Sequence, residues 1–159
     1  MDFGRRGLAW LVGWYALYQA VHIPVNLRAL ARLAAGATMD FPAPPPAGGW
    51  SPDAVAFFAG MASLDLGNAL LALVFTWGFY RRRGWAMPLG LITLTVSLYA
   101  ALLFAYATHA AGAWRPPGRG SYLLIYTAFL PVVALYAVLL GHALRGLPPR
   151  GREGPTSSG

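Results

Sequence analysis

The sequence predicts an all-α integral membrane protein: a four-transmembrane-helix bundle with up-down-up-down connectivity. Of the 159 residues, 57% are hydrophobic and 11% are charged, whereas a soluble domain carries roughly 25% charged residues. The apolar residues come in four long blocks, and a helix needs about 20 mostly apolar residues to cross a bilayer. Polar, arginine- and proline-rich segments separate the blocks, so successive helices run in opposite directions.

The first two predicted helices cover about residues 7–31 and 53–80. The first is uncharged from residue 8 to residue 27 but contains polar side chains and Pro24. A proline inside a helix removes a backbone hydrogen bond, so a bend is expected there. The second holds one charge inside its apolar run, Asp65.

The third and fourth predicted helices cover about residues 85–111 and 120–145, and Pro131 predicts a bend in the last one. The connections "YRRRGW" and "AWRPPGRG" are short, so helices two and three, and helices three and four, pair as antiparallel hairpins. Residues 1–147 are therefore predicted to form one transmembrane domain. Residues 148–159 lack core-forming side chains and are predicted to be a disordered tail.

The net charge of +7 comes from arginine alone. These arginines flank the apolar blocks, so the membrane explains them and no nucleic acid partner is expected. The richer side holds Arg5, Arg6, Arg81, Arg82, Arg83, Arg145, Arg150 and Arg152, and the other side holds Arg28, Arg32, Arg115 and Arg119. Because the richer side normally faces the cytoplasm, both termini are expected there. The lysine-free composition suggests a bacterial inner membrane.

Polar side chains recur on one face of each of the first two helices. Gln19, His22 and Asn26 are spaced three and four apart and share a face, as do Asp65 and Asn68. Counted along the helices at about 1.5 Å per residue, the two faces lie at similar depth below the same surface. Later helices add polar groups to this layer: Ser97, Tyr99, Tyr126 and Thr127.

We expect these residues to line a cavity inside the bundle that binds a ligand and opens towards lipid, with bends at Pro24 and Pro131 widening it. An aspartate at membrane depth costs roughly 2.5–3.5 kcal/mol on insertion scales, so Asp65 is a functional candidate by default. The simpler alternative is that the amides, the histidine and the tyrosines only join neighbouring helices by hydrogen bonds.

The order of four motifs resembles the EXPERA superfamily, which includes the sigma-two receptor and the emopamil-binding sterol isomerase. The motifs are "HIPVNL", "SLDLGNALL", "FYRRRGW" and "IYTAFLPVV", within residues 8–144. The resemblance implies a cavity reached sideways from the bilayer that takes sterols or hydrophobic amines. It further implies that Asp65 pairs with a cationic nitrogen, and that His22 and Pro24 form the bend in the first helix. Two departures weaken a two-acid mechanism: Leu30 replaces a second acid, and Asp65 is shorter than the usual glutamate.

The favoured function is binding, or transport, of a sterol-, isoprenoid- or hydrophobic-amine-like ligand. One alternative is an isomerase that moves a double bond, with His22 and Asp65 transferring the protons. A second alternative is a b-type haem protein, for which His22, His109 and His142 lie at poorly matched depths. No cofactor or metal site is predicted, and the absence of cysteine removes thiolate ligands and nucleophiles. A homodimer through the third helix stays open.

Overall fold

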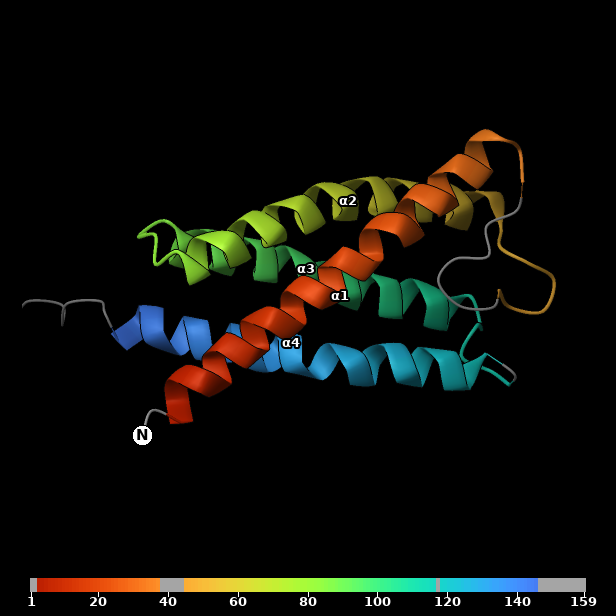
Figure 1. The fold of residues 1–159 in the computed structure, drawn as a ribbon. Coiled ribbons are helices and arrows are strands. Elements are labelled where there is room, and N and C mark those ends of the chain that lie inside the picture. Colours follow the sequence, from red (N-terminus) through yellow and green to blue (C-terminus); the bar gives the residue numbers. More distant parts are fainter. Residues whose placement is uncertain (1–2, 38–44, 117, 146–159) are drawn as a thin grey trace, which may run out of the picture.

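The computed structural model of this protein describes residues 3–37, 45–116 and 118–145. Four helices follow one another along the chain: α1 (Phe3–Ala34), α2 (Pro52–Tyr80), α3 (Ala86–Ala110) and α4 (Arg119–Arg145). They form the predicted all-α, up-down-up-down bundle (Figure 1). Helices α2, α3 and α4 begin and end within one residue of the predicted bounds, whereas α1 extends further at both ends. The predicted disordered tail lies outside the described residues.

The four helices pack as a ring in which each helix contacts the next one along the chain and α1 also contacts α4. The start of α1, the end of α4 and the tight α2–α3 connection lie at one end of the bundle, here called the turn end. The opposite end is called the loop end. Helix α1 crosses the other three helices obliquely on its way from the turn end to the loop end (Figure 1).

Three of the helices, α2, α3 and α4, are long and apolar enough to cross a membrane. This finding indicates an integral membrane protein. Helix α1 is 32 residues long but falls outside this group. The reason lies in its composition, because the predicted polar stripe occupies three positions in the middle of its apolar run.

Local backbone contacts explain where α2 begins and ends. The Ser51 hydroxyl accepts a hydrogen bond from the backbone N–H of Ala54 at 3.2 Å, and Pro52 occupies the first turn. Both features are typical of a helix start. At the other end Arg82 has a φ of 54°, and the N–H of Arg83 bonds to the carbonyl of Gly78 at 2.9 Å. This left-handed residue stops α2 and turns the chain into α3.

The turn end holds the larger and more tightly packed core. Val12, Tyr15, Phe75, Leu94 and Leu135 are fully buried there and belong to one cluster that all four helices supply. The aromatic ring of Phe75 lies directly against the backbone of α3 at Gly90. A β-carbon at residue 90 would lie 2.5 Å from the Phe75 ring. Close approach of α2 and α3 therefore depends on this glycine.

The two prolines at which bends were expected, Pro24 and Pro131, lie inside continuous helices. Helix α1 continues through Pro24 and α4 continues through Pro131. Each proline leaves one carbonyl of its own helix without the usual N–H donor. The bends expected at these positions stay a prediction.

Replacing Gly90 with alanine is expected to destabilise the bundle by about 1–3 kcal/mol, because the added methyl group overlaps the buried Phe75 ring. Gly67→Ala is the matched control, since a β-carbon there meets nothing within 4 Å and alanine favours a helix. Thermal unfolding of the two variants in detergent measures the difference. Equal melting temperatures would contradict the packing described.

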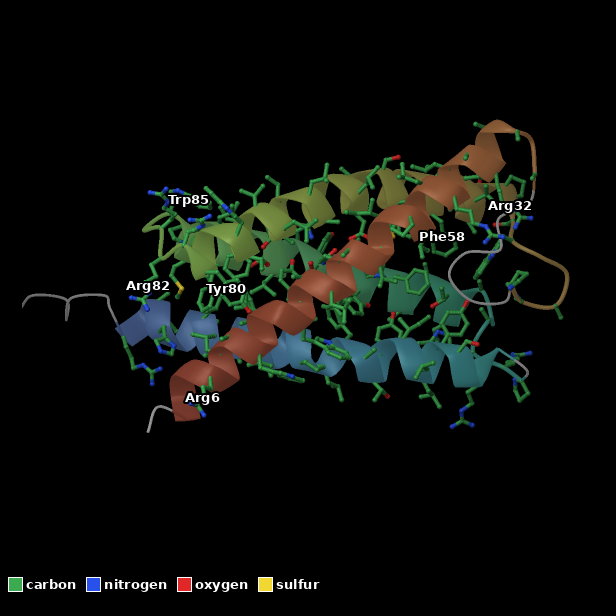
Figure 2. All side chains as sticks on the ribbon, viewed as in Figure 1. Arg6, Arg32, Phe58, Tyr80, Arg82 and Trp85 are labelled. Carbon is green, nitrogen blue, oxygen red and sulfur yellow. The ribbon has the colours of Figure 1, made fainter. Side chains whose placement is uncertain are left out.

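The arginines of the described residues lie at the two ends of the bundle. Arg6 and Arg82 are at the turn end and Arg32 is at the loop end (Figure 2). The turn end carries the larger share, with Arg81, Arg83 and Arg145 beside the two labelled residues. The predicted orientation, with this end in the cytoplasm, follows from the positive-inside rule.

Cysteine labelling can test this orientation because the chain has no native cysteine. Ala47→Cys, exposed at the loop end, is expected to react with a membrane-impermeant thiol reagent in intact bacterial cells. Gly84→Cys, exposed at the turn end, is expected to react only after the membrane is opened. The reverse pattern would place the turn end outside.

Candidate functional site

A cavity of about 440 Å³ lies inside the bundle, towards the loop end from the tightly packed core. All four helices line it: Trp14, Leu17, Tyr18, Gln19, Val21, His22, Val25 and Asn26 from α1, Phe58, Met61, Ala62 and Asp65 from α2, Ser97, Ala100, Ala101 and Phe104 from α3, and Leu124, Ile125, Tyr126, Ala128 and Phe129 from α4. Its volume falls within the range of about 300–1,000 Å³ that is usual for small-molecule sites.

The floor of the cavity is a hydrogen-bonded cluster centred on the Ser97 hydroxyl of α3. Tyr15 and Gln19 reach it from α1, with the Tyr15 hydroxyl at 2.8 Å and the Gln19 Nε2 at 2.9 Å. Asn68 reaches it from α2, with its Nδ2 at 2.9 Å. One serine oxygen therefore joins three helices.

This cluster uses the full hydrogen-bonding capacity of Ser97. A hydroxyl has one hydrogen to donate and two lone pairs to accept with. The amide N–H groups of Gln19 and Asn68 take the two lone pairs, so the Ser97 hydrogen is left for the oxygen of Tyr15. This direction of the Tyr15 bond belongs to the amide orientations of the structure, in which Gln19 Nε2 and Asn68 Nδ2 both donate to Ser97.

The acidic residue of the cavity is held by the polar stripe of α1. The Asn26 Nδ2 donates to Asp65 Oδ2 at 2.8 Å. The His22 Nδ1 lies 3.9 Å from the same oxygen, a distance compatible with an ion pair when the imidazole is protonated but too long for a hydrogen bond. His22 and Asp65 are each partly exposed, at 25% and 20% of the side-chain surface. The predicted meeting of the two polar faces is confirmed.

Aromatic rings form much of the remaining wall. The Tyr18 ring meets the His22 ring edge-on at 4.5 Å and the Phe129 ring at 5.6 Å between centroids. Further towards the loop end, Phe58 and Phe104 lie 5.6 Å apart, and Phe58 is labelled there in Figure 2. Aromatic and aliphatic side chains therefore make up most of the wall around the polar groups.

The chamber has an opening on the side of the bundle, between α1 and α4. Leu17 and Val21 of α1 and Leu124 of α4 line the cavity and are also 59%, 54% and 71% exposed. Near this opening, the Trp14 Nε1 donates to the carbonyl of Ala128 at 3.0 Å and joins α1 to α4. The open side of the cavity therefore lies between two helices and away from both ends of the bundle.

The structure brings together most of the sequence-predicted site residues. Six of them line the cavity: Gln19, His22, Asn26, Asp65, Ser97 and Tyr126. Asn68 is buried behind the wall, where it holds Ser97. The Tyr126 hydroxyl is itself engaged, since it donates to the carbonyl of Ala101 at 3.0 Å.

Tyr99 and Thr127 were expected in the same polar layer, but they lie on the outer surface. Tyr99 is 65% exposed, and it follows the inward-facing Ser97 by two residues, which is about 200° around a helix. Thr127 is exposed and its hydroxyl bonds to the carbonyl of Leu123 in its own helix at 2.8 Å. Matching depth along a helix did not establish which way these side chains face.

The three histidines lie in three separate places. His22 lines the cavity, whereas His109 is exposed at the loop end of α3 and His142 is exposed at the turn end of α4. No two of them face each other as axial haem ligands must. Among the described residues, no group of three or more histidine, aspartate or glutamate side chains is placed to hold a metal ion.

The structure also adds residues to the candidate site beyond those predicted to bind a ligand. Tyr15 extends the α1 stripe by one turn below Gln19, and its hydroxyl completes the Ser97 cluster. Its spacing of four from Gln19 was a usable signal. Phe58 and Phe104 gave no such signal, because aromatic residues in an apolar helix are equally common on outer faces.

Ser97→Ala is expected to destabilise the protein by about 1–3 kcal/mol or more, because it leaves three buried polar side chains without their common partner. Ser63→Ala is the matched control, since that hydroxyl is exposed and bonds within its own helix. Thermal unfolding in detergent measures both. A Ser97→Ala variant as stable as Ser63→Ala would show that the cluster contributes little.

Comparison of the chain with protein-family models found no match, and comparison with curated proteins and with solved structures found none either. The chemistry of this cavity is therefore the basis for assigning a function.

Proposed function

We propose that this protein binds a lipophilic small molecule or lipid inside its helix bundle, with Asp65 pairing with a polar or cationic group of the ligand. The observation that carries the proposal is a carboxylate at the wall of a largely apolar chamber inside the bundle. Its described contacts are the neutral amide of Asn26 and the imidazole of His22. A carboxylate in such surroundings gains most from a positively charged partner.

The rest of the chamber suits the same ligand. Aromatic rings such as Tyr18, Phe58 and Phe129 attract cations through their faces and also accept apolar groups. The side opening at Leu17 and Leu124 offers entry from the hydrocarbon layer. A hydrophobic amine, or a sterol- or isoprenoid-like molecule with a polar head, satisfies both the apolar wall and the carboxylate.

Membership of the EXPERA superfamily is part of this proposal, as is a transport role for the same cavity. In that reading Asp65 takes the role of the amine-binding carboxylate. We place the protein in a bacterial inner membrane with both termini in the cytoplasm, because the arginines favour the turn end. Hosts of this kind usually lack sterols, which favours an isoprenoid or hopanoid-like lipid as the natural ligand.

A second candidate function, a double-bond isomerase, is favoured by one specific distance. The His22 Nδ1 lies 3.9 Å from Asp65 Oδ2, so two proton-transfer groups border the same chamber. A protonated His22 would give its proton to one alkene carbon while the Asp65 carboxylate removes a proton from the neighbouring allylic carbon. The net result moves the double bond and returns one proton to the pair.

Asp65→Asn is expected to weaken binding of a hydrophobic amine at least about tenfold, since it removes the negative charge but keeps the side-chain size. His22→Ala is expected to retain binding. Asp53→Asn is the matched control, because Asp53 is exposed at the start of α2. Calorimetric titration of protein in lipid nanodiscs with a phenylalkyl amine measures the affinities.

Two outcomes would change the assignment. Unchanged amine affinity in Asp65→Asn would refute cation pairing by this carboxylate. Turnover of an isoprenoid or sterol alkene, abolished in both Asp65→Asn and His22→Ala, would replace binding by the isomerase function.

A further inference from the structure

An exposed aromatic and basic cluster lies at the turn end, where α2 passes into α3. The Trp77 and Trp85 rings stack at 6.0 Å between centroids with 28° between their planes, and they are 52% and 42% exposed. The Arg83 guanidinium lies over the Trp77 ring at 5.9 Å from its centroid. This distance is within the range of a cation–π contact. Trp77, Arg81, Arg83 and Trp85 are here called the turn-end platform.

Contacts with the backbone of α2 hold the platform in place. A β-carbon at residue 78 would lie 2.5 Å from the Trp85 ring, so this ring rests directly against the helix at Gly78. The N–H of Arg81 bonds to the carbonyl of Trp77 at 3.0 Å, so Arg81 continues the helical register of α2. Four residues apart, Trp77 and Arg81 share one face of the helix. Two guanidinium groups therefore border one pair of exposed indole rings.

The positive charge of the platform has no negative partner among the described residues. Their two acidic side chains, Asp53 and Asp65, lie at the loop end of α2 and at the cavity. Within the part of the chain that the structure describes, Arg81 and Arg83 form no ion pair. Guanidinium groups match the oxygen atoms of a phosphate or carboxylate well. The platform therefore favours an anionic ligand.

Exposed apolar side chains lead away from the platform along α2. Leu70, Val74 and Trp77 are 55%, 47% and 52% exposed, and their spacing of four and three residues places them on one face. The same face ends in Arg81. From residue 70 to residue 81 this stripe is about 16 Å long, and one leaflet supplies half of a hydrocarbon core that is about 30 Å thick. The stripe therefore matches the depth of one leaflet.

Helix α3 repeats this pattern on its own outer face. Ile92 and Val96 lie seven and eleven residues after Trp85, share its face, and are 57% and 41% exposed. Because the Trp77 and Trp85 rings stack, the stripes of α2 and α3 begin side by side at the platform.

We propose that the turn-end platform binds the phosphate of an anionic phospholipid, at a site separate from the cavity. The phosphate lies against Arg81 and Arg83, whose guanidinium groups each have five N–H donors. The indole rings lie at headgroup level, where tryptophan is enriched in membrane proteins. The acyl chains cover the exposed stripes of α2 and α3. A soluble phosphate has the same charge but no chain to cover these stripes.

The α2–α3 turn also contains a matched control for this site. Arg82 is exposed like its neighbours, but Figure 2 shows it on the opposite side of the turn from Trp85. Its left-handed backbone, with a φ of 54°, accounts for this different direction. Arg82→Gln therefore removes one positive charge from the turn end without removing a residue of the platform.

Lipid retention by the full chain tests the proposal. The protein is reconstituted in equal amounts of phosphatidylglycerol and phosphatidylcholine with identical acyl chains, released in detergent and measured by native mass spectrometry. The unmodified protein is expected to retain phosphatidylglycerol about tenfold more often. Arg83→Gln is expected to lower this preference about fivefold, as the loss of one arginine near an anionic headgroup predicts.

Two further variants locate the effect. Arg82→Gln is expected to leave the preference for phosphatidylglycerol nearly unchanged. Trp77→Leu keeps an apolar side chain but removes the ring beneath Arg83, so it is expected to lower the preference as well. Should Trp77→Leu fail to fold, the two arginine variants, which change exposed side chains, still decide.

Three results would overturn the proposal. Equal retention of the two lipids by the unmodified protein would show that no anionic site exists. Equal losses in Arg82→Gln and Arg83→Gln would show attraction by net charge instead of a site. Displacement of the retained lipid by excess glycerol phosphate would identify a soluble phosphate as the occupant. None of these measurements involves Asp65, so the proposed function of the cavity is tested separately.

Discussion

The hydroxyl of Ser97 is the contact on which the rest of this structure depends. It is the one atom described here at which side chains from α1, α2 and α3 meet, through Gln19, Asn68 and Tyr15. Apolar contacts between membrane helices are not directional, because lipid tails are as apolar as the side chains. Hydrogen bonds are directional, because each has a preferred distance and angle. A cluster of them can therefore fix the orientation of the helices that it joins. It therefore determines how α1 is rotated and which of its residues face the bundle interior.

The same cluster lies between two parts of the bundle that differ in packing. Towards the turn end, Phe75 packs against Gly90 and a dense apolar core fills the interior. Towards the loop end, α1 has crossed obliquely and the four helices enclose the cavity. The packed core and the cavity thus lie in opposite halves of one helix bundle. The bundle can be hollow in one half because the packed half holds the helices together.

Helix α1 is less apolar than the other three helices because of its polar stripe. For this reason α2, α3 and α4 meet the requirements of a membrane span, whereas α1 does not. Gln19 and Asn26 are nevertheless only 1% exposed, so their polar side chains are buried between the helices and do not reach the outer surface of the bundle. Both side chains line the cavity and donate their amide N–H groups to neighbouring helices. The polar stripe of α1 is therefore used inside the bundle, where it joins α1 to α2 and α3.

The sequence by itself determined the helix number, the approximate helix bounds and the up-down connectivity, because long apolar blocks and short polar turns are local properties of the chain. It also determined that the Gln19, His22 and Asn26 face and the Asp65 face share a depth, because helical rise is constant. Only the tertiary structure decided which polar residues face inward. Rotation of a helix about its axis depends on contacts with its neighbours, so Ser97 lies at the centre of the bundle while Tyr99, two residues later, lies outside. The tertiary structure also decided that Asn26, rather than His22, forms the hydrogen bond to Asp65. It likewise decided that the cavity opens between α1 and α4. Both features depend on side-chain positions and helix crossing, which no local sequence pattern specifies.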